Sequence, residues 1–394
     1  MTAPLPAEPP PPQASPGETY LAECRTLVLA EIQRIVRARA ADEDAYRLML
    51  DYPLRRAKGL RPALCIAVCR ALGGDLAPVL PSAAVIEIYH NAFLIHDDIE
   101  DGSLERRGAP ALHHTHGIPT AINCGDGLLA LTLAPLLANT ELLGLGRALR
   151  VLEEYARAVT ESFEGQTREL AWIQQGSWDL TDDDYEQMVL RKTCSYSFVA
   201  PGLVGAIVAG ASPAAERALA PFLRSLGVAF QIQDDLLNLE EGRDAYGKEL
   251  AGDLWEGKRT LMLLHALRSS PEPDRARALE ILRKPRPAQV SSLDPRRRLL
   301  ADLESAGILD APTRAAATAY LEQHTSPAEK TAEEVQFLHS LLVSHSSIPH
   351  ARAVCARHAA AAEQAFQRLT PHIPDSPHTR FLAWLKDYVV RREW

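Results

Sequence analysis

Apolar and polar residues recur with helical spacing along most of the chain, and the period-two pattern of strands is scarce. Alanine, leucine, arginine and glutamate, which favour helices or fit them well, dominate these stretches. Turns such as Gly73-Gly74 and Gly102-Ser103 separate them. The periodicity predicts helices over Glu18–Ala41, Pro62–Leu72, Pro81–Ile99, Thr120–Ala138, Leu149–Gln175, Asp182–Lys192, Tyr196–Ala211, Pro213–Leu239 and Thr260–Arg268. We therefore expect an all-α protein.

Some of these helices are apolar on nearly every face, as in Ser197–Ala211, where Pro201 could introduce a kink. A helix of this kind lies at the centre of a large bundle or crosses a membrane. We expect a bundle, because we read the apolar stretches as too short or too interrupted to span a bilayer. The pattern therefore predicts a large buried helical core and no membrane span.

Prolines change the pattern towards the C-terminus. Five of them between Ser269 and Pro295 are expected to break regular structure. The first 17 residues are rich in proline and alanine and predict a disordered leader. We expect one domain over residues 18–394, with a catalytic core at about 50–268 and a C-terminal helical extension at about 296–394. Helical patterns in that extension cover about Arg297–Ser305, Ala311–His324, Ala332–Ser344, His350–Leu369 and His378–Val390.

The composition is that of an ordinary globular protein. The 394-residue chain is 46% hydrophobic, which is ample for a core. Its formal net charge of −9 argues against nucleic acid as the main partner. None of its six cysteines forms a C-x-x-C pair, and a chain of this size needs no disulfide framework. These features predict a cytoplasmic protein.

Two copies of one acidic pattern stand inside apolar helical runs, Asp97-Asp98-Ile99-Glu100-Asp101 and Asp234-Asp235-Leu236-Leu237-Asn238. On a helix, positions i, i+1 and i+4 lie within roughly one third of the circumference, so each unit presents two or three oxygen ligands on one side. Like charges this close together repel and need a compensating cation. Oxygen ligands favour Mg²⁺, which proteins usually share with substrate phosphates. The two motifs therefore predict a magnesium-dependent enzyme that acts on diphosphates.

Basic residues accompany both acidic units. Arginine binds phosphate through a bidentate fork, and lysine binds it as a point charge. Two acidic units together with these cations suggest two anionic groups, one held through metal and one held directly by arginine and lysine. The residues concerned are Lys58, Arg61, Arg106, Arg107, Lys192, Lys248 and Lys258.

The segment from about Lys58 to Leu267 resembles the trans-isoprenyl diphosphate synthase, or polyprenyl synthetase, family. Each matching motif alone is weak, but the motifs occur in the family order. They are K-x-x-R-P at Lys58–Pro62, the first acidic motif at His96–Asp101, R-R-G at Arg106–Gly108, Gly125-Asp126, Lys192-Thr193, F-Q-I-x-D-D-x-x-N at Phe230–Asn238, and the lysines of G-K and E-G-K-R-T. The resemblance implies an all-α isoprenoid-synthase-type bundle with a central active-site cavity, assembled as a homodimer.

By the same resemblance, the enzyme joins an allylic diphosphate to isopentenyl diphosphate, head to tail and in trans. The implied catalytic residues are Asp97, Asp98, Asp101, Lys192, Asp234 and Asp235. Three Mg²⁺ ions are implied, two on the first motif and one on the second, with the five aspartates and Asn238 as ligands. The implied allylic diphosphate site comprises Arg107, Lys192, Lys248 and Lys258. The implied isopentenyl diphosphate site comprises Lys58, Arg61, His90 and Arg106. Residues implied to line the reacting carbons are Thr193, Phe230 and Gln231.

Two positions depart from the family pattern. Gly59 follows Lys58 where arginine is usual, and Asn238 replaces the last aspartate of the second motif. Asparagine still offers an oxygen ligand, so this change weakens metal binding at most. For His90, a role in core packing and a role in substrate binding are equally compatible with the sequence.

Product length depends on how far the growing chain can extend away from the metals. Phe93 stands four residues before Asp97, which is one helical turn, roughly 5 Å, deeper. With the small Ala92 beside it, this ring is expected to close the pocket and to stop growth at farnesyl or, with a slight preference, geranylgeranyl diphosphate. Core packing is the alternative interpretation of Phe93.

Two other functions stay open on the sequence. A class I terpene cyclase shares the fold and the first acidic motif, but it usually carries N-x-x-x-S-x-x-x-E in place of the second and needs no second diphosphate site. A non-catalytic subunit that regulates an active synthase typically loses acidic ligands, whereas both units are almost intact here. An assay of the purified chain alone separates the enzymes from the regulatory subunit.

Overall fold

The computed structural model describes most of the chain, namely residues 15–39, 43–240, 251–285, 295–325 and 329–391. Residues 1–14 of the predicted leader, and Lys248, lie outside these ranges. The helices are α1 (Pro16–Arg39), α2 (Glu43–Leu54), α3 (Leu60–Ala71), α4 (Leu76–Glu100), α5 (Leu112–His116), α6 (Ile118–Leu131), α7 (Leu133–Leu143), α8 (Leu145–Gln175), α9 (Asp182–Val189), the π-helix η1 (Leu190–Val199), α10 (Ala200–Ala209), α11 (Pro213–Glu240), α12 (Gly252–Glu256), α13 (Leu261–Ser269), α14 (Glu272–Leu282), α15 (Pro295–Ser305), α16 (Ala311–Thr325), α17 (Ala332–Ser344), α18 (Ser347–Leu369), the 3₁₀ turn η2 (Thr370–His372) and α19 (Pro377–Arg391).

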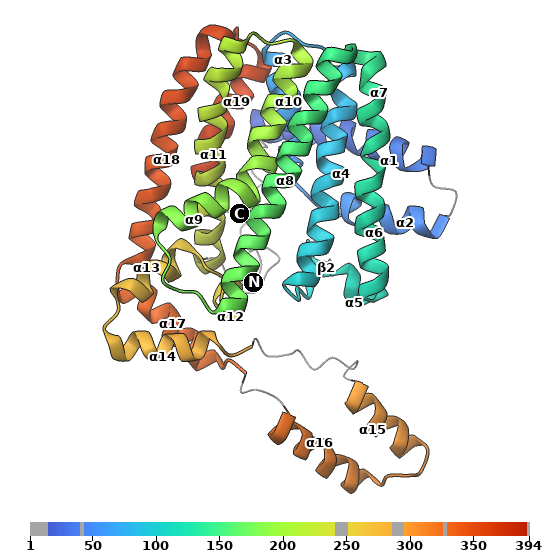
Figure 1. The fold of residues 1–394 in the computed structure, drawn as a ribbon, viewed down its shortest axis with the longest axis vertical. Coiled ribbons are helices and arrows are strands. Elements are labelled where there is room, and N and C mark those ends of the chain that lie inside the picture. The colour runs from blue at the N-terminus through green and yellow to red at the C-terminus, as the bar shows by residue number, and fades with distance from the viewer. Residues whose placement is uncertain (1–14, 40–42, 241–250, 286–294, 326–328, 392–394) are drawn as a thin grey trace, which may run out of the picture.

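The long helices stand side by side as an upright bundle, with α18 and α11 at one edge and α6 and α7 at the other (Figure 1). Helix α11 packs along α18, α10 along α3, and α8 along η1. Their facing sides carry leucine, valine, isoleucine and alanine and form one continuous buried core. The predicted all-α class is confirmed. The only strands in the described part of the chain are the two-residue pair β1 (Glu105–Arg106) and β2 (Ala109–Pro110).

Two helix contacts are so close that only glycine fits. A Cβ on Gly205 of α10 would lie 2.3 Å from the carbonyl oxygen of Cys65 on α3. A Cβ on Gly165 of α8 would lie 2.3 Å from the backbone nitrogen of Lys192 on η1. The second contact brings η1, and with it Lys192, directly against α8.

Helices α9, η1 and α10 run on without a break, so the expected gap between Lys192 and Tyr196 is wrong. The π-helical stretch lies just before Pro201, which stands in the first turn of α10. Proline cannot donate the backbone hydrogen bond of a regular helix and clashes with the preceding turn. A local widening to π geometry is a known way to accommodate such a disturbance and is frequent at functional sites.

Other predicted helices lie within about five residues of the observed ones, with one exception, whereas α2, α5, α12 and α14 were not predicted. Thr120–Ala138 is two helices, α6 and α7, which meet at Thr132. The expectation that the proline-rich stretch after Ser269 lacks regular structure is wrong, because α14 lies within it. Pro271 and Pro273 occupy the N-cap and first turn of α14, where a missing N–H costs little.

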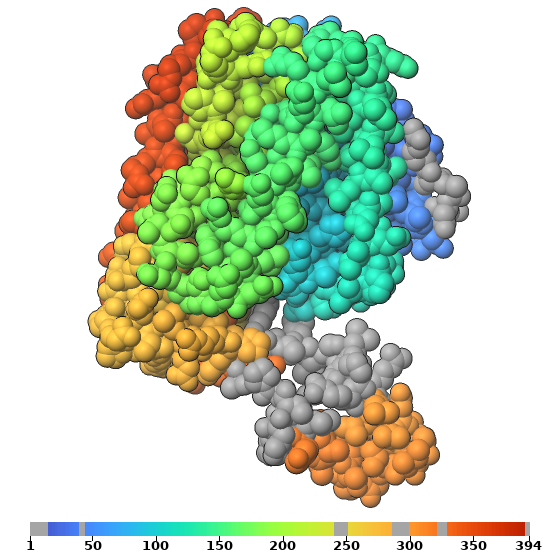
Figure 2. All heavy atoms as spheres, in the orientation of Figure 1, coloured from blue at the N-terminus to red at the C-terminus, as the bar shows by residue number. Residues whose placement is uncertain are grey.

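The C-terminal helices divide into two groups. Helices α18 and α19 pack into the bundle, against α11 and against α3 and α1. Helices α15 and α16 pair with each other and stand apart from the bundle (Figures 1 and 2). The predicted boundaries of a catalytic core and an extension stay a prediction.

Within the part of the chain that the structure describes, three helical stretches are long and apolar enough, by length and composition alone, to cross a membrane: Leu76–Glu100, Ile118–Leu143 and Asp182–Ala209. They are therefore not too short to span, contrary to our expectation. In the first and third, 72% and 78% of the apolar window is buried inside the protein, as expected for core helices. In Ile118–Leu143 the buried share is 39%, so much of its apolar surface is exposed.

Candidate active site

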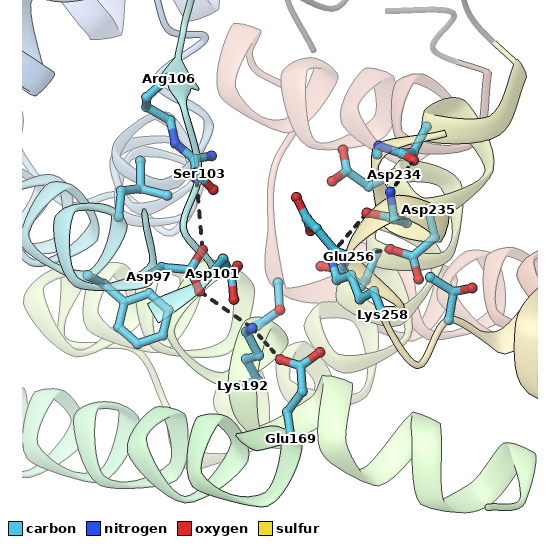
Figure 3. Close-up of a pocket in the computed structure, with 18 of the residues that line it drawn as sticks. Asp97, Asp101, Ser103, Arg106, Glu169, Lys192, Asp234, Asp235, Glu256 and Lys258 are labelled. Carbon is cyan, nitrogen blue, oxygen red and sulfur yellow. Dashed lines mark hydrogen bonds and ion pairs between the residues drawn. The ribbon is translucent and has the colours of Figure 1, made fainter. Parts of the chain in front are cut away.

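A cavity of about 770 Å³ opens at one end of the bundle, between α4, α8, η1 and α11. Figure 3 shows the two acidic motifs on opposite walls, with Asp97 and Asp101 on one side and Asp234 and Asp235 on the other. Lys192 lies between these walls, beside Glu169. The sequence motifs, 137 positions apart, therefore meet at one site (234 − 97).

The first motif ends α4, and its three aspartates face different surroundings. Asp97 and Asp101 line the cavity, whereas Asp98 is 1% exposed and does not. Asp101 is exposed at the mouth of the cavity, but the protein around it partly desolvates its carboxyl group, and this together with the Asp97 carboxylate raises the pKa of Asp101 to about 8. The outer two carboxylates are thus the ones available to a ligand.

Asp98 is bound by two other side chains. Arg106 donates from Nε to Asp98 Oδ1 at 2.9 Å and makes a second, shorter contact through Nη2. The Tyr52 hydroxyl donates to Asp98 Oδ2 at 2.6 Å. Arg106 Nη2 also lies 3.9 Å from Asp97. Asp98 therefore positions Arg106 at the cavity wall, and the metal-binding role predicted for Asp98 stays a prediction.

Arg106 is a residue of the hairpin β1–β2, and contacts of the hairpin backbone fix its position. The two-residue turn of the hairpin places Arg107 and Gly108 at positive φ, 54° and 76°, as tight hairpin turns require. Arg55 Nη1 donates to the carbonyl oxygen of Arg106 at 2.9 Å, and Arg55 Nη2 donates to that of Pro110 at 2.9 Å. The backbone of the hairpin is thereby tied to the bundle.

The second motif resembles the first in its tyrosine-bound second aspartate, but here that aspartate also lines the cavity. Asp234 and Asn238 line the cavity, and the buried Asp235 accepts hydrogen bonds from Tyr185 Oη at 2.7 Å and Gln231 Nε2 at 2.8 Å. Burial raises the pKa of Asp235 to about 7, although Lys258 opposes the shift. In both motifs, therefore, a tyrosine hydroxyl holds the second aspartate.

Lys192 joins the first acidic motif to a third carboxylate, Glu169. Its Nζ lies 2.5 Å from Glu169 and 3.5 Å from Asp97. Burial alone would raise the pKa of Glu169, but Lys192 and Lys258 outweigh it and hold that pKa below its usual value. Burial likewise lowers the pKa of Lys192, but Glu169 and Asp97 outweigh burial and raise it. The pair is ionised in a largely buried position.

Further residues of the cavity were not predicted from the sequence. Glu169 is a carboxylate on the buried face of α8, which is the one signal that could have found it. Lys258 Nζ lies 3.7 Å from Asp253, which raises the pKa of Lys258 well above its usual value. Arg259 stacks on Trp178, with its guanidinium carbon 4.1 Å from the ring centroid. Asp253, Glu256 and Arg259 all line the cavity.

The residues predicted for isopentenyl diphosphate lie partly in the cavity. Arg61 and His90 line it, and burial together with Arg61 holds the pKa of His90 well below its usual value, so the ring is neutral. Lys58 does not line it, and its Nζ lies 5.5 Å from the ring centroid of Tyr388. Arg107, which was predicted for the allylic diphosphate, does not line the cavity either, and it donates to the Tyr52 carbonyl oxygen at 2.9 Å.

Among the described residues predicted for the site, most line this cavity and four do not. Those that line it are Arg61, His90, Phe93, Asp97, Asp101, Arg106, Lys192, Thr193, Phe230, Gln231, Asp234, Asp235, Asn238 and Lys258. Those outside its lining are Lys58, Ala92, Asp98 and Arg107. The residue roles stay predictions.

The cavity lining is better suited to a cation that is bound jointly by protein and substrate than to one bound by protein side chains alone. Within the described ranges, no three His, Cys, Asp or Glu side chains converge as a ready-made metal site. The carboxylates stand instead on opposite walls and offer oxygen only (Figure 3). Mg²⁺ typically binds through one or two carboxylates, waters and substrate phosphates. The donor set therefore fits magnesium that binds together with a diphosphate.

The polyprenyl synthetase family profile matches residues 43–295, which include both acidic motifs and the basic residues between them. The chain belongs to the polyprenyl synthetase family. The family resemblance inferred from the motif order is thereby confirmed.

Relatives in the family include a short chain isoprenyl diphosphate synthase of Methanothermobacter thermautotrophicus, 36% identical over 57% of this chain and 67% of that protein. A geranylgeranyl diphosphate synthase of Methanosarcina mazei is 36% identical over 55% of this chain and 65% of that protein. The match thus spans about two thirds of the length of these relatives. The crystal structure of a geranylgeranyl pyrophosphate synthetase from Pyrococcus horikoshii is similar, with a TM-score of 0.74 and 27% identity, and the match covers 95% of this chain and 99% of that one.

Proposed function

We propose that this member of the polyprenyl synthetase family condenses an allylic diphosphate with isopentenyl diphosphate, head to tail and in trans, into a short prenyl diphosphate. The observation that carries the proposal is the pair of carboxylate groups on opposite walls of a cavity that also holds Lys192 and Lys258. The names of the relatives, short chain isoprenyl and geranylgeranyl diphosphate synthases, support the same reaction.

The allylic diphosphate would bind between the two acidic walls. Asp97, Asp101, Asp234 and Asn238 would hold Mg²⁺ there, and bound magnesium would supply Lewis-acid stabilisation of the departing diphosphate. Lys192, beside Asp97, and Lys258, beside Asp253, provide two cations in the cavity. These cations would stabilise the negative charge that develops on the diphosphate as the C–O bond breaks. The number of ions, two on the first motif and one on the second, is part of this proposal.

The second substrate would bind on the side of Arg61 and Arg106. Both guanidinium groups reach the cavity, and the neutral His90 adds a hydrogen-bonding group without charge. Held there, the double bond of isopentenyl diphosphate forms the new carbon–carbon bond at the allylic carbon as the C–O bond breaks. The diphosphate that leaves removes the proton, and a new double bond forms. No side-chain nucleophile is required.

Phe93 supports a short product. Phe93 lines the cavity from α4, four residues before Asp97. Its ring stacks with that of Tyr89, and the two ring centroids are 6.1 Å apart. Ala92 is fully buried and does not reach the cavity. We propose that the Phe93 ring limits growth to farnesyl or geranylgeranyl diphosphate, with the second favoured.

We also propose a homodimer through α6, α7 and α8. Leu133, Leu137 and Phe163 are 57%, 66% and 68% exposed, and Ile118 and Leu145 are exposed nearby. Exposed apolar side chains on neighbouring helices are typical of a protein interface. The occupant that we propose is a second copy of this chain, and light scattering of the purified protein tests it, since a monomer would leave this apolar surface uncovered. Six free cysteines fit the proposed cytoplasmic location.

Product analysis tests the function. The purified chain is incubated with Mg²⁺, isopentenyl diphosphate and dimethylallyl, geranyl or farnesyl diphosphate in turn, and the dephosphorylated alcohols are identified. Linear prenyl alcohols support the proposal. Cyclic hydrocarbons without use of isopentenyl diphosphate indicate a terpene cyclase, and no turnover with any allylic substrate indicates a regulatory subunit.

A further inference from the structure

Tyr196 lies where the two proposed substrate regions meet. It stands one turn after Lys192 on η1, is 6% exposed, and lines the cavity. Its ring centroid lies 5.5 Å from that of Phe93 and 5.6 Å from that of Tyr89. Tyr196 therefore continues, from the opposite helix, the aromatic wall that Phe93 begins on α4.

The hydroxyl end of the same side chain reaches the basic region. Arg61 Nη2 donates to Tyr196 Oη at 3.2 Å, and the guanidinium carbon lies 5.0 Å from the ring centroid. His90 Nδ1 lies 3.4 Å from the hydroxyl. The next residue of η1, Ser197, accepts from Arg61 Nε at 3.0 Å. Two consecutive residues of the π-helix thus fix the direction of one guanidinium group.

The buried side chains around Tyr196 form a cluster distinct from the main core, although Leu129 and Tyr155 pack against both. Tyr89, Ala158, Tyr196 and Ala200 form a small apolar cluster of their own, apart from the large one that joins the other helices. A smaller side chain at position 196 therefore opens space next to the cavity and leaves the main core packed. This makes the position suitable for changing the shape of the cavity without unfolding the protein.

We propose that Tyr196 determines substrate and product specificity in the prenyl transfer, and this proposal rests on the function proposed above. Its ring and Phe93 together close the apolar end of the cavity and so limit the length of the product. Its hydroxyl orients Arg61 and His90 towards the diphosphate of the second substrate. Tyr196 is a positioning residue for that diphosphate and a wall of the pocket for the growing chain.

Two substitutions separate the ring from the hydroxyl. Tyr196→Phe keeps the ring, so the product length should stay the same, while the KM for isopentenyl diphosphate should rise about tenfold with a much smaller change in kcat, as expected on loss of a hydrogen bond to a charged group. Tyr196→Leu removes the ring, so the product should lengthen by one or more isoprene units. Circular dichroism and thermal melting of each full-length variant confirm that it is folded.

Ser197→Ala is the matched control, because it removes the other hydrogen bond to Arg61 and leaves the ring in place. It should raise the same KM and leave the product length unchanged. A folded Tyr196→Leu protein with the parent product length overturns the proposal, and so does a Tyr196→Phe protein with the parent KM. If Tyr196→Leu does not fold, the KM of Tyr196→Phe decides. A parent protein that transfers no prenyl group is a different result, since it rejects the proposed function itself.

Discussion

The hydroxyl of Tyr185 donates a 2.7 Å hydrogen bond to Oδ2 of Asp235, the buried second aspartate of its motif. Tyr52 makes the corresponding bond to Asp98 at 2.6 Å. In each motif a tyrosine hydroxyl thus holds the buried second carboxylate, and the first and last members line the cavity. The motifs differ in that Asp98 lies behind the cavity wall, whereas Asp235 also lines the cavity.

Removal of the Tyr185 hydroxyl should make the enzyme more sensitive to pH. Burial raises the pKa of Asp235 to about 7, and the bond from Tyr185 opposes that rise. In Tyr185→Phe this pKa should rise further, so the acidic limb of the kcat/KM profile should move to higher pH and more Mg²⁺ should be needed for half-maximal rate. Stability should fall by about 1–3 kcal/mol, because a buried acceptor loses its partner.

The matched control for this variant is Tyr155→Phe. The Tyr155 hydroxyl donates to Thr132 Oγ1 at 3.1 Å and does not line the cavity. Its pH profile and Mg²⁺ requirement should match those of the parent. A Tyr185→Phe enzyme with the parent pH profile contradicts the role given to this bond.

Lys192 should be needed for stability as well as for rate. Lys192→Met leaves Glu169 and Asp97 without their shared cation in a buried position, and breaking a buried pair typically costs about 3–5 kcal/mol. The double variant Lys192→Met, Glu169→Gln should recover part of this loss, because the charge of the more deeply buried partner is removed while that of Asp97 remains. Both variants should be impaired in prenyl transfer. Urea denaturation of parent, single and double variants measures the effect, and a single variant as stable as the parent is inconsistent with it.

Magnesium should stabilise the protein more at alkaline than at acidic pH. The pKa values of Asp101 and Asp235, about 8 and about 7, lie above the value of about 4 expected in the unfolded chain. At pH values above the unfolded pKa of about 4 and below the folded pKa values of about 7 and about 8, the folded protein therefore binds more protons than the unfolded one. The stability of the metal-free protein falls as pH rises through this range. Bound Mg²⁺ favours the ionised carboxylates and offsets this loss.

Thermal melts with and without Mg²⁺ at about pH 6 and about pH 8.5 bracket the window in which both groups ionise. The rise in Tm on addition of Mg²⁺ should be larger at the higher pH. Asp101→Asn should reduce that rise and weaken its dependence on pH. Equal shifts at both pH values in the parent protein would speak against metal binding at these carboxylates.

Phe93→Ala should lengthen the product. The ring lines the cavity and stacks on Tyr89, so its removal opens space towards the interior of the bundle. Chromatography of the dephosphorylated products should show a shift by at least one isoprene unit. Val343→Ala serves as a control, because Val343 is 58% exposed on α17 and lies outside both the cavity lining and the proposed dimer surface. An unchanged product length places the end of the pocket elsewhere.

The sequence predicted best those helices whose periodic apolar pattern continues over many residues. Helices α4 and α11, which carry the acidic motifs, were expected to within about five residues, because their apolar faces are packed in the core and leave a clear pattern. The hairpin that presents Arg106 has only two residues in each strand and shows no such pattern. The π-helix precedes Pro201, and a proline in a helical pattern does not by itself say whether the helix ends, kinks or widens there.

The missed members of the site share one property. Tyr52 and Tyr185 meet Asp98 and Asp235 across 46 and 50 positions of sequence, and Glu169 meets Lys192 across 23. Each is a single residue whose role depends on a tertiary contact, so motif spacing could not find it. Tertiary contacts also explain why Asp98 and Arg107 do not line the cavity as predicted, because both side chains form hydrogen bonds with other groups of the protein.

The central claim is that the two acidic walls act together on an allylic diphosphate, and its most direct test is product analysis of the parent with Asp97→Ala and Asp234→Ala. We predict linear prenyl alcohols from the parent in the presence of Mg²⁺ and isopentenyl diphosphate, and a loss of at least about a hundredfold in rate for each variant, as expected for interactions made in the transition state. A parent that makes no linear product, or a variant of either wall that keeps the parent rate, would contradict the claim.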